Sequence, residues 1–421
     1  MSAPPAAKWW SVSATVRGFY DDNPTTQPNG FIKIATWGYE LSPGVGVNVG
    51  NQQTTFTAAY TFDYMYYEKP LTTFNGFGGF SQGTTKSDQT HTFVAALDHT
   101  FSPRYNIHAS DTFVVGQQPD TLRAGNAVNV FQRISGNNIV NAAALTLNGV
   151  LTPLLGFEVG YNNNIYDYDA QELSGPLNRM ENYAHFDLRW TLAHETVGVL
   201  GYQFGFVDYT GTGPFANPLG IVNPPPSISN INLRNTISHT GYVGADHTFL
   251  PNLVGSVRGG VSYYDYYNDS GASDLGPYAQ VSLTYTYAPE SHFALGFNEG
   301  RNASSFSGVQ NTNTPNSLNS FVHDTETSVV YGSVVHRIVP HLFGTVRGTF
   351  QNSTYHGGGQ GINGESDRFY EVTADLEYRF SPNVSVHGGY DYNQLCSSLG
   401  PIVGPRDYDR NRFYIGATAS Y

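Results

Sequence analysis

The sequence is short of cysteine, of lysine and of long apolar runs. The single Cys396 excludes an internal disulfide, a CxxCH haem site and a cysteine-based zinc site. The only lysines are Lys8, Lys33, Lys69 and Lys86, and charged residues make up 13% of the chain, so the usual polar surface of soluble helices is missing. No run of 18 apolar residues exists and the mean hydropathy is −0.32, which excludes transmembrane helices.

Positive charge and catalytic motifs are scarce as well. The formal net charge is −13, whereas a nucleic-acid partner would require a basic surface. The 13 histidines are scattered singly, and neither an HExxH motif, a phosphate loop nor a dinucleotide fingerprint is present. We therefore expect no nucleic-acid partner, no enzymatic activity, no cofactor and no metal site.

Tyrosine, phenylalanine and glycine are abundant, and they follow a period of two. In the segment 370–380, even positions are apolar or aromatic, from Tyr370 to Phe380, and odd positions are polar, from Glu371 to Arg379. This alternation predicts a strand with one apolar and one polar face. The tight turn at 381–383 and a second alternating run at 384–393 complete a long hairpin. Aromatic-tipped strands with acids and an arginine on the other face favour lipid outside and water inside.

The same rhythm runs along the whole chain and predicts 18 strands. We expect them at 8–20, 35–49, 54–68, 88–101, 105–117, 136–150, 153–168, 180–194, 196–209, 234–249, 253–268, 275–287, 291–304, 320–338, 341–355, 367–380, 384–394 and 408–421. Every second connection is short, and several carry a proline, as in FSPRY at 101–105 and FLPNL at 249–253. The others are long, such as 118–135, 210–232 and 305–319. The pattern predicts an all-β fold, a single closed up-and-down antiparallel transmembrane β-barrel with short periplasmic turns and long extracellular loops.

No linker or change of composition divides the chain. We therefore expect one domain over residues 1–421, with a flexible N-terminus at 1–7, in the bacterial outer membrane. The start MSAPPAAKWW resembles a processed N-terminus. The end YIGATASY, closing on Tyr421, resembles the C-terminal assembly signal of outer-membrane barrels, although Ala419 replaces a bulkier residue. The expected partners are outer-membrane lipid and lipopolysaccharide, the barrel-assembly machinery through the C-terminal strand, and further copies of the chain in a homo-oligomer.

Several strands end in tyrosine and acid before a long loop, as in YDDN at 20–23, YDYDA at 166–170 and YDYN at 390–393. An aromatic girdle followed by solvated acids accounts for this pattern. The alternative is a set of divalent-cation sites bridging to lipid phosphates, because clustered carboxylates favour hard cations.

The early motifs RGFYDDNPTTQ, YELSPGVGVNVG and AAYTFDYMYYE, with the later SP turns, resemble the putative beta-barrel porin family associated with exopolysaccharide genes. This resemblance implies an outer-membrane pore, either passive or dedicated to a glycan. It implies no catalytic residues.

If the polar faces point inward, they deliver twice as many acids as arginines to the lumen. The pore-lining candidates are Arg17, Glu40, Asp63, Asp98, Glu158, Asp187, Arg189, Asp246, Arg258, Arg347, Glu371, Asp375, Glu377, Arg379 and Asp391. Such an interior would favour cations. Mutual neutralisation of acids and arginines on the wall is an equally strong alternative. Inward aromatic candidates that could stack on sugar rings are Tyr183, His185, Tyr242 and His387. Ordinary packing in the lumen or in the girdle is the favoured alternative for each.

These observations favour a porin-like channel for passive diffusion of small hydrophilic solutes, with a preference for cations. Two alternatives remain open, namely a dedicated conduit for exopolysaccharide export and a structural or adhesive surface barrel plugged by its loops.

Overall fold

The computed structural model describes residues 8–74, 80–82, 85–116, 138–169, 178–211, 232–269, 271–304, 322–357, 362–399 and 406–421. Eighteen long antiparallel strands form one sheet, and a separate two-stranded hairpin accompanies it. Among these residues, no helix is long and apolar enough to cross a bilayer.

The first nine strands of the large sheet run from the N-terminus to the middle of the chain. They are β1 (Trp10–Asp21), β2 (Thr36–Gly50), β3 (Thr54–Tyr67), β6 (Ser87–Ser102), β7 (Tyr105–Gly116), β8 (Asn138–Thr152), β9 (Leu155–Tyr168), β10 (Arg179–Ala193) and β11 (Thr196–Tyr209). The second nine are β12 (Thr236–Leu250), β13 (Leu253–Asp265), β14 (Ser273–Ala288), β15 (Ser291–Asn302), β16 (Val322–Val339), β17 (Leu342–Gly357), β18 (Ser366–Ser381), β19 (Val384–Ser397) and β20 (Tyr408–Ser420).

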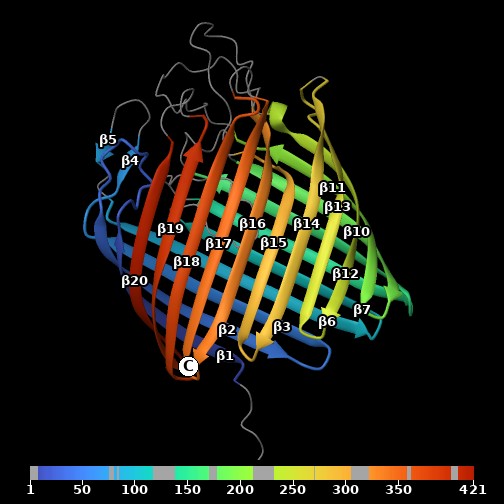
Figure 1. Ribbon diagram of the computed structural model, residues 1–421, viewed down its shortest axis with the longest axis horizontal. Coiled ribbons are helices and arrows are strands. Elements are labelled where there is room, and N and C mark those ends of the chain that lie inside the picture. Colours follow the sequence, from blue (N-terminus) through green and yellow to red (C-terminus); the bar gives the residue numbers. More distant parts are fainter. Residues whose placement is uncertain are drawn as a thin grey trace, which may run out of the picture.

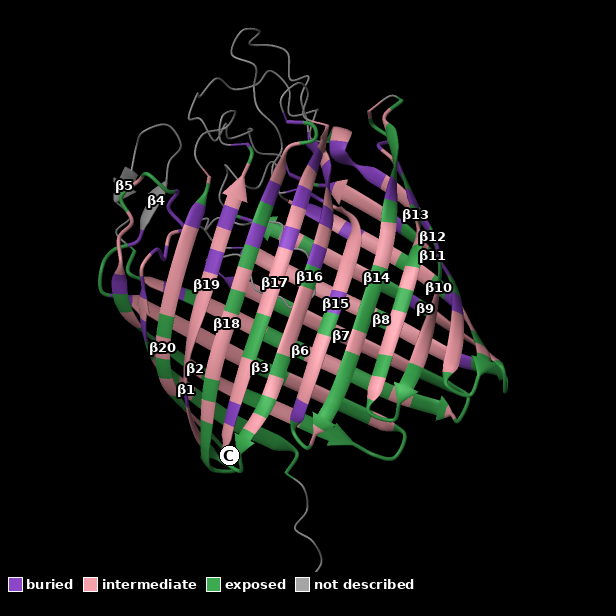
Figure 2. Ribbon diagram, viewed as in Figure 1, coloured by how far each residue is buried: buried purple, intermediate pink, exposed green. Residues whose placement is uncertain are grey.

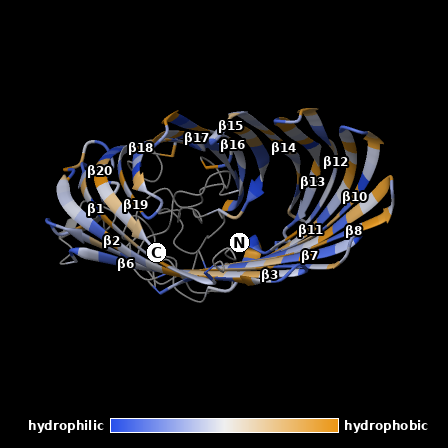
Figure 3. Cartoon of the chain, turned by 90° about the horizontal axis from the view of Figure 1, so that it is seen from below, coloured by the Kyte–Doolittle hydropathy of each residue, from blue (hydrophilic) through white to orange (hydrophobic). Residues whose placement is uncertain are grey.

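The sheet closes on itself, because β1 pairs with both β2 and β20. Every other strand pairs with its neighbours in sequence, so the chain runs up and down around a ring (Figure 1). Seen from below, the ring is flattened, with β11 on one side and β15 and β16 on the other (Figure 3). The predicted closed antiparallel barrel of 18 strands is therefore confirmed.

The predicted strand ends agree with the observed ends to within about three residues, with two local differences. The stretch between β3 and β6 was predicted as loop only, but it contains the small hairpin β4 (Thr72–Phe74) and β5 (Phe80–Gln82). Such short strands lie below the length at which alternation can be detected. In β2, no residues pair with β3 between Leu41 and Gly44, since Pro43 has no N–H to donate to the ladder.

The apolar face of each strand points outward. In β18, Leu376 is 54% exposed, and on β20 Ile415 is 67% exposed, a pattern that a soluble core would not tolerate over a whole sheet. The fully buried apolar residues instead form small clusters where strands meet the long loops, for example Phe369 with Leu395 and Tyr408. Buried residues accordingly concentrate at the upper ends of the strands in Figure 2. The outer surface is built for contact with hydrocarbon.

Two rows of hydrogen-bonded polar side chains border this outer apolar surface. In the upper row, Tyr60 bonds His91 at 2.7 Å and Tyr202 bonds His239 at 2.7 Å. The row continues with Tyr161 to Asn182 at 2.7 Å and Tyr390 to Asn411 at 2.6 Å.

The lower row repeats one arrangement near the short turns. Thr54 bonds His99 and Thr196 bonds His247, both at 2.8 Å. Each of these histidines lies eight residues after the upper-row histidine of the same strand, β6 or β12. At about 3.3 Å per residue and a tilt of roughly 40°, the two rows lie about 20 Å apart, close to the height of the apolar band of outer-membrane barrels.

Candidate functional site: the barrel interior

The inward faces of the strands carry all fifteen charged residues predicted to line the pore, since each alternates with outward apolar positions. The structure gathers most of them into distinct sets along the wall. Two sets matter most, one on β18–β20 and β1–β3 and the other on β9–β13. Whether these residues govern conduction stays a prediction.

The first set, which we call the acidic wall set, centres on Glu40. Its carboxylate accepts hydrogen bonds from Arg17 at 3.3 Å and from Arg412 at 3.0 Å. Arg17 also donates to Nε2 of His387 at 2.9 Å. Glu40 is only 6% exposed, so the two guanidinium groups hold it against the wall.

Three further carboxylates of the acidic wall set lie beside hydroxyl groups. Asp375 accepts from Tyr414 at 3.0 Å. Asp63 lies beside the hydroxyl of Ser42, which donates to Glu40 at 3.3 Å, and Asp391 lies beside the hydroxyl of Thr373. No ion pair joins these three acids to an arginine among the described residues, so the set holds four carboxylates, including Glu40, against the two guanidinium groups of Arg17 and Arg412.

The second set is more nearly neutral. Asp246 forms ion pairs with Arg189 and with Arg258, and in each pair a carboxylate oxygen lies 2.7 Å from a guanidinium nitrogen. Glu158 lies 3.9 Å from Arg189 and 3.4 Å from His185. Here the alternative of mutual neutralisation describes the contacts well.

Two of the predicted sugar-stacking residues have polar partners instead. Tyr242 donates its hydroxyl hydrogen to Asp187, and its ring lies 5.0 Å from that of Tyr278. His387 accepts from Arg17. Of the others, His185 lies beside Glu158, and Tyr183 lies on the same strand as both His185 and Asp187.

The remaining predicted lumen residues lie outside these two sets, although Glu377 is next to the first, directly across from His387. Glu377 pairs with Arg379 at 2.9 Å near a short turn, and Asp98 pairs with His108 at 2.7 Å. Arg347 is exposed on β17, and Glu371 lies on β18.

Sequence reasoning missed a group of residues that crosses the mouth of the barrel at the long-loop end. We call it the mouth bridge, and it consists of Tyr209, Arg234, Ala303 and Ser304. Tyr209 at the end of β11 packs against Ala303, which follows β15. The guanidinium of Arg234 lies 4.1 Å from the Tyr209 ring and donates to the carbonyl oxygen of Ser304.

Three strands separate β11 from β15 in the wall, so this contact passes across the mouth of the barrel. Beside it, Tyr266 donates its hydroxyl hydrogen to Asp324 of β16. Burial raises the pKa of Tyr266, and the adjacent carboxylate raises it further, so the phenol keeps its proton. Arg234 is fully buried. No signal of period two could have shown this group, because Arg234, Ala303 and Ser304 lie outside the strands.

The long loops contribute on the other side of the mouth through the segment 22–35. Lys33 pairs with Asp409 at 2.7 Å, and Asn29 donates its backbone N–H to the carbonyl of Asp407 at 2.6 Å. The acids of the YDDN motif are also engaged, because Asp21 pairs with Arg410 and Asp22 accepts from Asn411. The predicted long loops 118–135 and 305–319 lie outside the described residues, as do most of 210–232.

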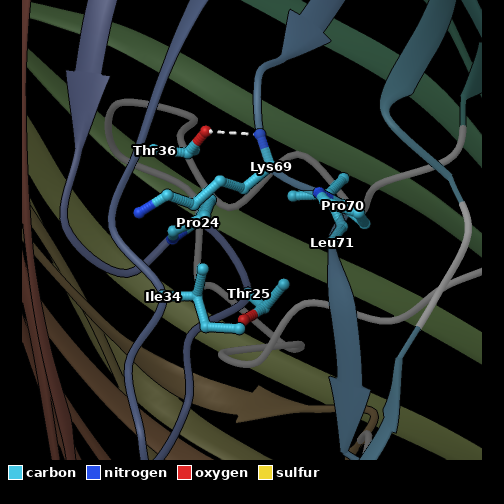
Figure 4. Close-up of a pocket in the computed structure, with 7 residues that line it drawn as sticks. All are labelled: Pro24, Thr25, Ile34, Thr36, Lys69, Pro70 and Leu71. Atoms are coloured by element: carbon cyan, nitrogen blue, oxygen red, sulfur yellow. Dashed lines mark hydrogen bonds between the residues drawn. The ribbon is translucent and has the colours of Figure 1, made fainter.

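A small pocket lies beside this segment (Figure 4). It is lined by Pro24, Thr25, Ile34, Thr36, Lys69, Pro70 and Leu71. The backbone N–H of Lys69 donates to the Thr36 hydroxyl at 3.1 Å. The lining holds no arrangement of nucleophile and base, and the described residues contain no group of three or more His, Cys, Asp or Glu side chains placed to hold a metal ion.

The family model described as Putative beta-barrel porin 2 matches residues 307–421. The resemblance to β-barrel porins that the early motifs indicated is thus found again in the last strands. No curated protein matches the sequence.

Three solved barrels illustrate the structural likeness. OccAB4 of Acinetobacter baumannii is 13% identical with a TM-score of 0.43, and each chain is covered to 100%. A BenF-like porin of Pseudomonas fluorescens is 11% identical with a TM-score of 0.47, covering 98% of this chain and 99% of that one. The FrpB iron transporter of Neisseria meningitidis is 11% identical with a TM-score of 0.48, covering 99% and 83%. The closed ring of strands defines an up-and-down antiparallel β-barrel, and the similarity to the porin family covers its last strands.

Proposed function

We propose that this protein is an outer-membrane channel through which small hydrophilic solutes diffuse passively, with a preference for cations. The closed ring of 18 strands is wide enough to leave an aqueous channel. The outward apolar surface between two polar rows suits a bilayer, and the short turns would face the periplasm.

The acidic wall set carries the proposed cation preference. Its four carboxylates exceed its two guanidinium groups, and Asp63, Asp375 and Asp391 keep hydroxyl partners that do not neutralise them. A water-filled passage beside such a wall concentrates cations and repels anions.

Planar-bilayer recording of the purified protein tests this proposal. In a salt gradient we expect steady open channels whose reversal potential favours the cation. Reversing two charges together, with Asp375→Lys and Glu377→Lys, should move the reversal potential toward the anion. Glu195→Lys reverses a single charge at an exposed short turn, outside the lumen, and should change the reversal potential little because salt screens charges beyond about 10 Å. An unchanged reversal potential in the double variant would remove the selectivity role.

A glycan conduit is the second candidate, and the half-buried inward ring of Tyr278 favours it, whereas Tyr242, whose ring lies 5.0 Å away, is only 7% exposed. Sugar rings stack on such surfaces. Block of the open channel by soluble oligosaccharide, lost in Tyr278→Ala, would support this candidate. A channel that stays closed in the bilayer would instead support a barrel plugged by its loops.

A further inference from the structure

Among the described residues, a carboxylate lies on the outward face near the middle of the apolar band. Asp111 of β7 has the same outward parity as Tyr105 and Phe113, which are 39% and 37% exposed. In the neighbouring strand it pairs with Ala95, which lies midway between His91 and His99 of the two polar rows. Asp111 is therefore close to the middle of the band, where hydrocarbon would penalise a charged group.

Only one of the two carboxylate oxygens of Asp111 accepts a hydrogen bond from the described residues. Asn141 of β8 donates to its Oδ1 at 2.8 Å. Its Oδ2 accepts no hydrogen bond from the described residues. Lipid tails offer no donor, and an unmet acceptor at this depth is costly.

Polar side chains also occupy the outward face of the next two strands, β9 and β10, at the level of the upper row and just below it. Asn163 of β9 donates to Oδ1 of Asn182 on β10 at 2.8 Å, and the amide nitrogen of Asn182 donates to none of the described residues. We call Asp111, Asn141, Asn163 and Asn182 the outer polar patch. It offers both acceptors and donors.

The outer surface around Asp111 is also recessed, because its neighbours have small side chains. Its cross-strand neighbours are Ala95 on one side and Ala143 on the other, and Ala109 precedes it on the same face. Larger side chains surround this depression, for example Leu97 at 37% and Leu145 at 44% exposed. Another protein surface could approach closely here.

We propose that the outer polar patch is the contact surface between copies of this chain in a homo-oligomer. Copies inserted by the same route share one orientation, so each presents its patch at the same depth. A surface that carries both donors and acceptors can then satisfy itself, as symmetric interfaces require. Lipid tails supply neither donors nor acceptors at that depth.

The mass of the full-length protein in mild detergent, measured by light scattering with detergent correction, tests this interface. We expect a multiple of 46.0 kDa for the wild type and for Ser110→Lys, whose side chain points into the lumen. Asp111→Lys should yield the monomer mass while keeping heat-modifiable gel migration. A monomeric wild type, or an oligomer that persists in folded Asp111→Lys, would overturn the proposal.

Cross-linking decides the matter if Asp111→Lys fails to fold. In a Cys396→Ser background, Ala109→Cys should give a disulfide-linked dimer under mild oxidation. Ala279→Cys, on the outward face of the distant β14, should not. Cross-linking at both positions or at neither would count against the patch.

Discussion

At the scale of single residues, the direction of a side chain matters more than its type. Leu376 on β18 is 54% exposed, and its neighbour Asp375 points inward to Tyr414. One face of the strand thus meets lipid and the other meets water. The stability cost of a substitution depends on which of the two the new side chain enters.

Leu376→Arg should lower the free energy of unfolding by roughly 2–4 kcal/mol, because it places a guanidinium in the apolar band. Equilibrium urea unfolding in lipid vesicles measures this loss. Thr373→Arg introduces the same group on the inward face of the same strand and should cost much less. Equal losses for both variants would contradict the assignment of faces.

Neutralising Glu40 should change the charge of the lumen wall at one defined point. Glu40→Gln leaves Arg17 and Arg412 facing one another without the carboxylate that both contact. We expect a shift of the reversal potential toward anions and a loss of about 1–3 kcal/mol of stability, since each guanidinium loses a charged acceptor.

Asp98→Asn is the matched control for Glu40→Gln. Its carboxylate is 63% exposed, and within the described part of the chain it pairs with His108 alone, so the stability should change little. A Glu40→Gln protein as stable as the wild type would show that water replaces the carboxylate without cost.

At the scale of elements, closure of the barrel depends on β20 fitting between β1 and β19. Gly416 has no room for a side chain, because a Cβ there would lie 2.6 Å from the carbonyl oxygen of Val16 and 2.6 Å from Cγ of Arg17. Gly241 in β12 is also in a strand, but nothing lies within 4 Å of its would-be Cβ.

Gly416→Val should therefore hinder closure at a cost of about 1–3 kcal/mol from overpacking, and Gly241→Val should be tolerated. The fraction of protein with heat-modifiable migration after refolding measures both effects. If the two variants refold equally well, the close approach at β20 does not limit closure.

At the scale of the whole molecule, the mouth bridge joins the end of β11 to the residues after β15, and we expect it to narrow the opening at the long-loop end. Arg234→Ala removes the guanidinium that contacts the Tyr209 ring and donates to the Ser304 carbonyl, and it leaves only the packing of Tyr209 against Ala303. Single-channel conductance and the size limit for sugars in liposome swelling should both rise.

Arg347→Ala supplies the control, since it removes the same charge from an exposed position on the wall and should leave the size limit unchanged. If the size limit for sugars rises in both variants, the effect comes from the lost charge and not from the mouth bridge.

Most of the strand pattern could be predicted from residues alone, because a period of two appears wherever one face meets lipid and the other meets water. The turns were equally clear, as FSPRY at 101–105 and FLPNL at 249–253 show. The outward direction of Asp111 could be seen in the same alternation, but its bond to Asn141 joins strands whose register the sequence does not display.

By itself the sequence determined the number of strands, their faces and the alternation of short and long connections, since each of these depends on neighbours along the chain. Only the tertiary structure decided which charges meet, as with Arg412 and Glu40, and which loop ends cross the mouth, as with Tyr209 and Ala303. Those contacts join residues far apart in sequence, and the shear and flattening of a closed ring fix them.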